Sequence, residues 1–201
     1  MIIMNFPTKL TVTRIVLSIL IVLIMAFPFE TIGLDIPVIR FRIDLSVKYI
    51  VCCFLFVVAS VTDYFDGYLA RKNHQVTDLG KNLDAIADKI LVNPILIVFA
   101  SEGIIHPIIP VIIVIRDIFV DSIKTQAASK GKVEGAISTG KIKTASMMLG
   151  IVLLFLSDIP FIFYNIRIDL LLVYFATIMS FISMFQYHSM YKKMVKATSE
   201  N

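Results

Sequence analysis

The sequence predicts an all-α integral membrane protein, a bundle of six transmembrane helices. Three observations predict this fold class. Of the 201 residues, 58% are hydrophobic and only 17% are charged, whereas soluble domains carry about a quarter charged residues. Six stretches are apolar and long enough to cross a bilayer, which takes roughly 20 residues. Basic residues gather on one side of these stretches. The length indicates one domain, residues 1–201.

The first three expected spans cover residues 10–29, 45–71 and 80–100. The first is an apolar run without a small-residue cleavage site behind it, so we interpret it as a span and not as a signal peptide. The second begins apolar and ends in polar residues. The third reverses this order, with aspartates first. Cys52 and Cys53 are neighbours within the second span and are expected to be packing residues.

The last three expected spans cover residues 107–127, 142–163 and 169–191. The fourth is strongly apolar but contains Arg116. The fifth follows a lysine-rich entry, and the sixth ends at a lysine-rich tail. Residues 40–48, between the first two spans, are mixed in character and are expected to lie at the membrane interface.

Basic residues predict the orientation of these spans. Positive charge accumulates on the cytoplasmic side of a membrane, so both chain ends are expected there. Few basic residues, mainly Arg40, Arg42 and Arg167, fall on the other side. The pI of about 9.0 then follows from topology and anionic lipid, without nucleic-acid binding. The cytoplasmic set is Lys9, Arg14, Arg71, Lys72, Lys81, Lys130, Lys132, Lys141, Lys143, Lys192, Lys193 and Lys196.

Four aspartates gather where the second span ends and the third begins. Asp63 and Asp66 are three residues apart, and Asp84 and Asp88 are four apart, so each pair shares one helix face. Two anions about 4 Å apart repel by about 4 kcal/mol at an effective dielectric near 20. Two divalent cations would balance four carboxylates, and oxygen ligands suit Mg²⁺ or Mn²⁺. The alternative, aspartates that only face water, leaves their spacing unexplained.

Arg71 lies one helical turn beyond Gly67 and beside these carboxylates. An arginine next to a metal site suggests an anion shared by both, most simply a phosphate. The alternative for Arg71 is an anchor at the membrane interface. Thr77, in the connecting loop, offers a hydroxyl to the same ligand.

The segment that contains the four aspartates resembles the signature of the CDP-alcohol phosphotransferases. Its pattern is D-x-x-D-G-x-x-A-R, then eight residues, G, three residues, D, three residues and D. The resemblance implies a six-helix fold, a homodimer, a cytoplasm-facing active-site cavity and two divalent cations. It implies that all four aspartates bind metal and that Asp88 is also the catalytic base. The CDP-lipid would lie near Gly67, Ala70, Arg71 and Thr77. The matching positions are Asp63, Asp66, Gly67, Ala70, Arg71, Gly80, Asp84 and Asp88.

A second cluster of cations follows the aspartates. Arg116 interrupts an apolar run, and an arginine within a span is a functional hypothesis by default. Lys124 lies on the same helical face. Local ion pairs with Asp117 and Asp121 are the structural alternative.

Lys141 and Lys143 open the fifth span within STGKIKTA, where the helix N-terminus also favours anions. This segment resembles the GKxKT segment of bacterial phosphatidylglycerophosphate synthases, and RDIF resembles their RE segment. The resemblance implies that Arg116, Lys124, Lys141 and Lys143 hold the phosphate of glycerol 3-phosphate. The sequence departs from that subfamily at four positions, Thr8, Ala85, Asp121 and Lys124.

The resemblance therefore implies transfer of a phosphatidyl group from CDP-diacylglycerol to glycerol 3-phosphate by an enzyme of the bacterial plasma membrane. Inositol phosphate, serine and phosphatidylglycerol are the alternative acceptors. A divalent-cation transporter is the rival class, but such sites favour broken helices and inverted repeats, and Arg71 would repel a passing cation. A membrane scaffold leaves the aspartates unexplained.

Overall fold

The computed structural model describes residues 6–29, 32–33, 36–40, 44–72, 78–129, 138–164 and 166–199. Within these ranges, residues 6–9, 40, 44, 64–72, 78–82, 129, 138, 162 and 193–199 are described by their backbone alone. The described chain forms six α-helices: α1 Phe6–Ala26, α2 Val47–Lys72, α3 Asp78–Ser101, α4 Ile108–Ser129, α5 Ser138–Phe155 and α6 Ile168–Ser199. A 3₁₀ helix, η2, covers Phe161–Tyr164.

The predicted all-α fold with six helices is confirmed, with three main differences. Residues 38–46 contain a small antiparallel hairpin, in which β1 Val38–Arg40 pairs with β2 Asp44–Ser46. The sixth helix continues to Ser199, past its predicted end at residue 191. The fifth helix ends at Phe155 and not at residue 163. Ser157 and Asp158 follow with φ of 51° and 63°, a left-handed backbone that cannot continue a right-handed helix.

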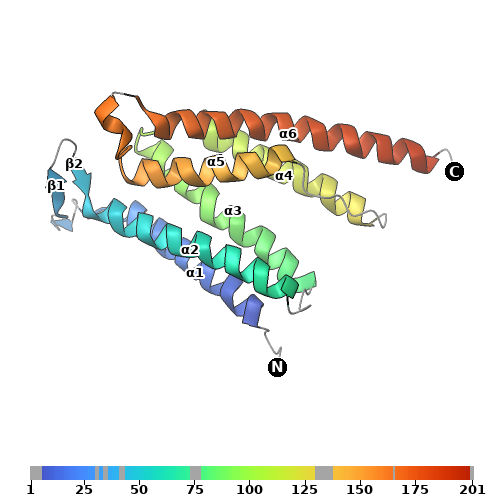
Figure 1. The fold of residues 1–201 in the computed structure, drawn as a ribbon, viewed down its shortest axis with the longest axis horizontal. Helices are drawn as coiled ribbons and strands as arrows, with labels where there is room; N and C mark the ends of the chain where they lie inside the picture. Colours follow the sequence, from blue (N-terminus) through green and yellow to red (C-terminus); the bar gives the residue numbers. More distant parts are fainter. Residues whose placement is uncertain are drawn as a thin grey trace.

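The helices form two groups that meet at the hairpin end of the molecule. Helix α1 packs against α2 and α3, and α6 packs against α4 and α5. Contacts of α3 with α4 and of α2 with α5 join the groups. The two groups diverge toward the opposite end, where α2 ends and α3 begins (Figure 1). The aspartate-bearing helix ends therefore lie away from the hairpin.

The hydrophobic core is built mainly at the hairpin half of the bundle. Phe155 of α5 is fully buried in it, with ring centroids 5.0 Å from Phe99 and 6.0 Å from Phe56. Cys52 and Cys53 are buried free thiols in this core, as their apolar surroundings predicted. Close approach of α5 to α6 requires Gly150, since a Cβ there would lie 2.8 Å from Val173 Cγ2.

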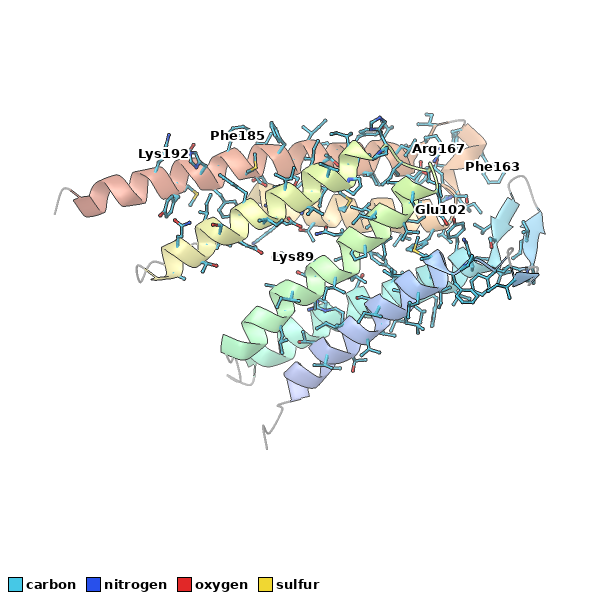
Figure 2. The ribbon with its side chains drawn as sticks, turned by 180° about the vertical axis from the view of Figure 1, so that it is seen from behind. Lys89, Glu102, Phe163, Arg167, Phe185 and Lys192 are labelled. Carbon is cyan, nitrogen blue, oxygen red and sulfur yellow. The ribbon has the colours of Figure 1, made fainter. Side chains whose placement is uncertain are left out.

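Large apolar side chains are exposed on every one of the six helices. Figure 2 shows Phe185 on the outer side of α6, where it is 55% exposed. By length and composition, one described helical stretch, Ile168–Lys192, could cross a membrane, and Leu10–Ala26 is a shorter apolar helix. The charged residues inside the other helices, such as Asp88 and Arg116, lower their mean hydropathy. Other exposed apolar residues include Val16, Leu23, Phe54, Ile86, Ile97, Ile115, Ile118, Leu149 and Ile178.

Candidate active site

Three of the four predicted carboxylates meet around one arginine, Arg14 of α1. Its Nη1 donates to Oδ1 of Asp63 from α2 and lies 3.2 Å from Oδ1 of Asp88. Its Nη2 donates to Oδ1 of Asp84 and lies 3.5 Å from the Asp84 carbonyl oxygen. Helices α1, α2 and α3 therefore meet at a single guanidinium.

Arg14 is buried, whereas its partners are open to the surroundings. Its side chain is 1% exposed, compared with 33% for Asp63, 52% for Asp84 and 48% for Asp88. Arg14 Nε is also buried and has no hydrogen-bond partner among the described residues. The guanidinium thus lies on the inner side of the carboxylates, and their outer side is accessible to a ligand.

The donor chemistry of this cluster fits Mg²⁺ or Mn²⁺, which prefer oxygen ligands. Among the described residues, no three acidic, His or Cys side chains are close enough to share one ion directly. The guanidinium of Arg14 contacts the three described carboxylates, and the side chain of Asp66, the fourth predicted ligand, is outside the described residues. Asp63, Asp84 and Asp88 together with Asp66 would supply the oxygen atoms for divalent cations.

The predicted CDP-lipid residues lie beyond the described side chains. Gly67, Ala70 and Arg71 belong to the last turns of α2, for which the backbone alone is described. Thr77 lies in the connection between α2 and α3, outside the described residues. The backbone places Gly67 one helical turn after Asp63, so these positions follow directly on the carboxylate cluster.

The predicted acceptor cations Arg116 and Lys143 come together at a buried carboxylate, Asp117. Oδ1 of Asp117 lies 3.0 Å from Arg116 Nη1 and 3.2 Å from Lys143 Nζ. Asp117 is 8% exposed, and Lys143 is 8% exposed as well. Asp117 therefore pairs with both cations. For Arg116 this is the local ion pair that was expected as the structural alternative.

Arg116 is fixed from its other side by α6. Its Nη2 and Nε lie 2.9 Å and 3.3 Å from Ser183 Oγ, and that hydroxyl donates its own proton to the Ser180 carbonyl oxygen at 2.8 Å. The oxygen of Ser183 thus accepts from the guanidinium. The start of α5 also lies near Arg116, since a Cβ built at Gly140 would lie 4.0 Å from Arg116 Nη2, an ordinary van der Waals contact.

The other two predicted acceptor cations occupy more open positions. Lys124 is exposed, and its Nζ lies 5.1 Å from the centroid of the Tyr187 ring, a cation–π contact. Lys141 is exposed near the start of α5. Asp121 forms an ion pair with Lys89 of α3, which Figure 2 shows on that helix. In the structure, Asp121 therefore pairs with Lys89 and not with Lys124.

Helix α3 links the carboxylate cluster to the acceptor cations. It carries Asp84 and Asp88, and its next turns contact α4 through Lys89 and Asn93. Lys89 pairs with Asp121, and Asn93 Nδ2 lies 3.4 Å from Oδ2 of Asp117. The two predicted clusters are thus connected by one helix.

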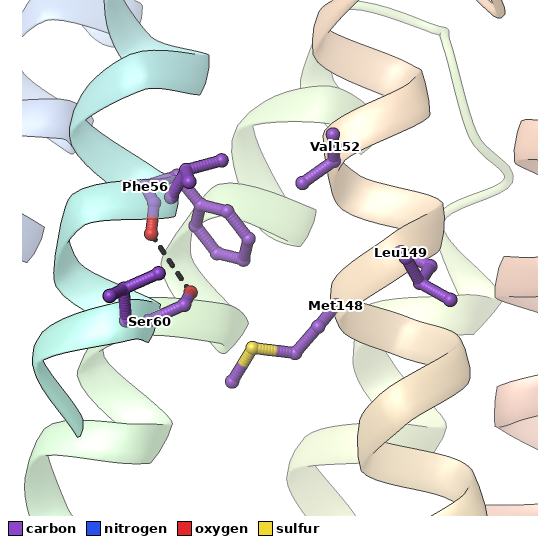
Figure 3. Close-up of a pocket in the computed structure, with 7 residues that line it drawn as sticks. Phe56, Ser60, Met148, Leu149 and Val152 are labelled. Atoms are coloured by element: carbon purple, nitrogen blue, oxygen red, sulfur yellow. Dashed lines mark hydrogen bonds between the residues drawn. The ribbon is translucent and has the colours of Figure 1, made fainter. Parts of the chain in front are cut away.

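An apolar groove lies between α2 and α5, one helical turn before Asp63 (Figure 3). It has a volume of about 260 Å³. Its one hydroxyl among the described lining residues, that of Ser60, donates to the Phe56 carbonyl oxygen at 2.8 Å. The groove is therefore almost entirely apolar. Its lining residues are Phe56, Val57, Ser60, Val61, Met148, Leu149 and Val152.

Comparison with known proteins identifies the family. The family model described as CDP-alcohol phosphatidyltransferase matches residues 4–190. The chain belongs to this family. The match covers both clusters, from Arg14 to Ser183, and it confirms the resemblance that the aspartate spacing predicted. The chain is therefore an enzyme of the CDP-alcohol phosphatidyltransferase class.

Three bacterial relatives of this CDP-alcohol phosphatidyltransferase are named CDP-diacylglycerol–glycerol-3-phosphate 3-phosphatidyltransferase. The protein from Bacillus subtilis is 32% identical over 185 residues, which cover 92% of this chain and 94% of the relative. The protein from Yersinia enterocolitica is 35% identical over 190 residues, 92% of this chain and 93% of the relative. The protein from Mycoplasma genitalium is 40% identical over 110 residues, 55% of this chain and 47% of the relative.

Sequence reasoning missed Arg14, Lys89 and Ser183 as residues of this region. Arg14 was assigned only to the cytoplasmic positive charge, although it interrupts an apolar run. The rule that makes an arginine within a span a functional hypothesis, applied to Arg116, would have found Arg14 too. Ser183 carries no such signal, because a lone serine in an apolar helix is common.

Proposed function

We propose that this chain transfers the phosphatidyl group of CDP-diacylglycerol to glycerol 3-phosphate, giving phosphatidylglycerophosphate and CMP. The observation that carries the proposal is the pair of nearly buried cations Arg116 and Lys143 around Asp117. Asp117 balances one of the two positive charges, so one remains for an acceptor phosphate. A neutral acceptor would leave that charge unpaired in a partly desolvated site, which is unfavourable. The names of the three relatives support the same reaction.

Two divalent cations, Mg²⁺ or Mn²⁺, are part of the proposal. Asp63, Asp66, Asp84 and Asp88 would hold them through carboxylate oxygens. Such ions, when bound, neutralise the diphosphate of the donor and stabilise charge on the leaving oxygen. Hard oxygen donors on the accessible side of the Arg14 guanidinium support this assignment.

Asp88 is proposed to accept the proton of the acceptor hydroxyl. The hydroxyl oxygen forms a bond to the phosphorus that bears the diacylglycerol. The bond from this phosphorus to the oxygen that bridges to CMP breaks, and CMP leaves with that oxygen. Asp88 suits the role because it belongs to the carboxylate cluster and precedes Lys89, which contacts α4 beside the acceptor cations.

The remaining predicted residues take binding roles in this proposal. Gly67, Ala70, Arg71 and Thr77 would contact the CDP moiety. Arg116 and Lys143 would bind the acceptor phosphate, and Lys124 and Lys141 would add positive potential from more exposed positions.

The apolar groove between α2 and α5 is proposed to take an acyl chain of the donor lipid. Its apolar lining matches a hydrocarbon chain, and it lies one helical turn from Asp63. A diphosphate bound at the carboxylates would therefore have its lipid tail beside α2.

We propose that the six helices span the bacterial plasma membrane, with both chain ends and the active site on the cytoplasmic side. Large exposed apolar side chains on all six helices support this placement, because extensive apolar surface is rare on soluble monomers. The lysines near the ends of α5 and α6 support the orientation. We also propose the homodimer that the family resemblance implies, which cross-linking in membranes checks.

An assay of CMP release by the purified protein tests the reaction. CDP-diacylglycerol is supplied with glycerol 3-phosphate, glycerol, inositol phosphate, serine or phosphatidylglycerol as acceptor. We expect glycerol 3-phosphate to give the fastest release. Faster release with another acceptor would overturn the acceptor assignment, whereas no release with any acceptor would overturn the transfer itself.

A further inference from the structure

Arg14 contacts the three described carboxylates through one oxygen each. The partner atom is Oδ1 in Asp63, in Asp84 and in Asp88. A carboxylate has a second oxygen with its own lone pairs, and these contacts do not use it. Since Arg14 is 1% exposed and its partners are 33% to 52% exposed, the guanidinium supports the carboxylates from the protein interior.

A buried guanidinium needs a reason, because burying a charge is costly unless it is paired and hydrogen-bonded. Arg14 meets carboxylates from two different helices, and its planar fork can address several oxygens at once, which a lysine cannot do. The carboxylates therefore determine where the Arg14 guanidinium lies, although its Nε is left without a hydrogen bond among the described residues.

We propose that Arg14 is the positioning residue of the cation site. Its guanidinium holds the Oδ1 atoms of Asp63, Asp84 and Asp88 in place, so that their second oxygens are oriented toward the cations. Groups that hydrogen-bond to metal ligands orient those ligands, and their loss typically lowers metal affinity 10- to 100-fold. This inference rests on the cation site of the proposed function.

Binding of Mn²⁺ to the purified protein, measured by electron paramagnetic resonance without substrates, tests the inference. We expect Arg14→Met to weaken Mn²⁺ binding by about tenfold or more. We expect Arg14→Lys to weaken it by about threefold or more, because the charge remains but the fork is lost. Arg167→Met is the matched control: Arg167 pairs with Asp169 at the start of α6, with Nη2 2.7 Å from Oδ2, and its loss should leave Mn²⁺ affinity unchanged.

Folded Arg14→Met protein that binds Mn²⁺ as tightly as the parent would overturn the positioning role. Tighter binding would overturn it too, since Arg14 would then compete with the cations. If Arg14→Met does not fold, unchanged affinity in Arg14→Lys overturns the role. Absence of Mn²⁺ binding in the parent protein would instead overturn the cation site, and this inference would fall with it.

Discussion

Ser183 is expected to act on the acceptor only through Arg116. Its Oγ accepts from Arg116 Nη2 at 2.9 Å and from Nε at 3.3 Å. Its own proton is committed to the Ser180 carbonyl oxygen, so the lone pairs of Ser183 are held toward the guanidinium. Replacing Ser183 by Ala would leave Arg116 with Asp117 as its described partner and free to turn away from the acceptor.

The magnitude follows from the contacts that are lost. A hydrogen bond to a charged group contributes about 1.5–3 kcal/mol, and 1.4 kcal/mol corresponds to about tenfold. Arg116→Ala should therefore lower kcat/KM for glycerol 3-phosphate by about 10- to 150-fold. Ser183→Ala removes only the orientation of Arg116, and we expect a loss of about tenfold at most.

A double-mutant cycle measures whether the two residues act together. CMP release is followed at saturating CDP-diacylglycerol while glycerol 3-phosphate is varied. In the Arg116→Ala background, Ser183→Ala should change kcat/KM by less than about twofold, since the group that it orients is gone. Thr177→Val is the control, because the buried Thr177 hydroxyl donates to the Val173 carbonyl oxygen within α6. Equal effects of Ser183→Ala in both backgrounds would refute the reasoning.

Three further predictions concern the cations, the base and the fold. Chelation should abolish CMP release and Mg²⁺ or Mn²⁺ should restore it, and full activity in excess chelator would contradict the cation site. Asp88→Asn should lower turnover by about a hundredfold or more with donor binding retained, and turnover near the parent rate would make Asp88 a ligand only. Asp158→Ala should lower the melting temperature, because Asp158 accepts from the backbone N–H of Ile168 and Asp169 at 3.1 Å and 3.0 Å and its loss costs about 1–3 kcal/mol. CMP release at 25 °C should persist, and an unchanged melting temperature would contradict this capping role.

Local pattern was enough to predict the helices and the chemistry of the carboxylates. The spacing of Asp84 and Asp88 depends only on the helical repeat, which neighbouring residues establish. The apolar runs likewise predicted six helices, with most bounds within a few residues of the observed ones. The end of the fifth helix was wrong, because the left-handed backbone at Ser157 and Asp158 leaves no signal in hydropathy. The end of the sixth was wrong as well, because α6 continues to Ser199 beyond its apolar run.

The sequence by itself thus determined which residue types carry charge and on which helix faces they lie. Tertiary packing alone decided which faces meet. Arg14 contacts Asp63, Asp84 and Asp88 across 49, 70 and 74 residues, and Lys143 reaches Asp117 across 26. The helical repeat places a side chain around its own helix axis, but the choice of partner depends on how helices distant in sequence pack. This is why the sequence does not predict the carboxylates as the partners of Arg14.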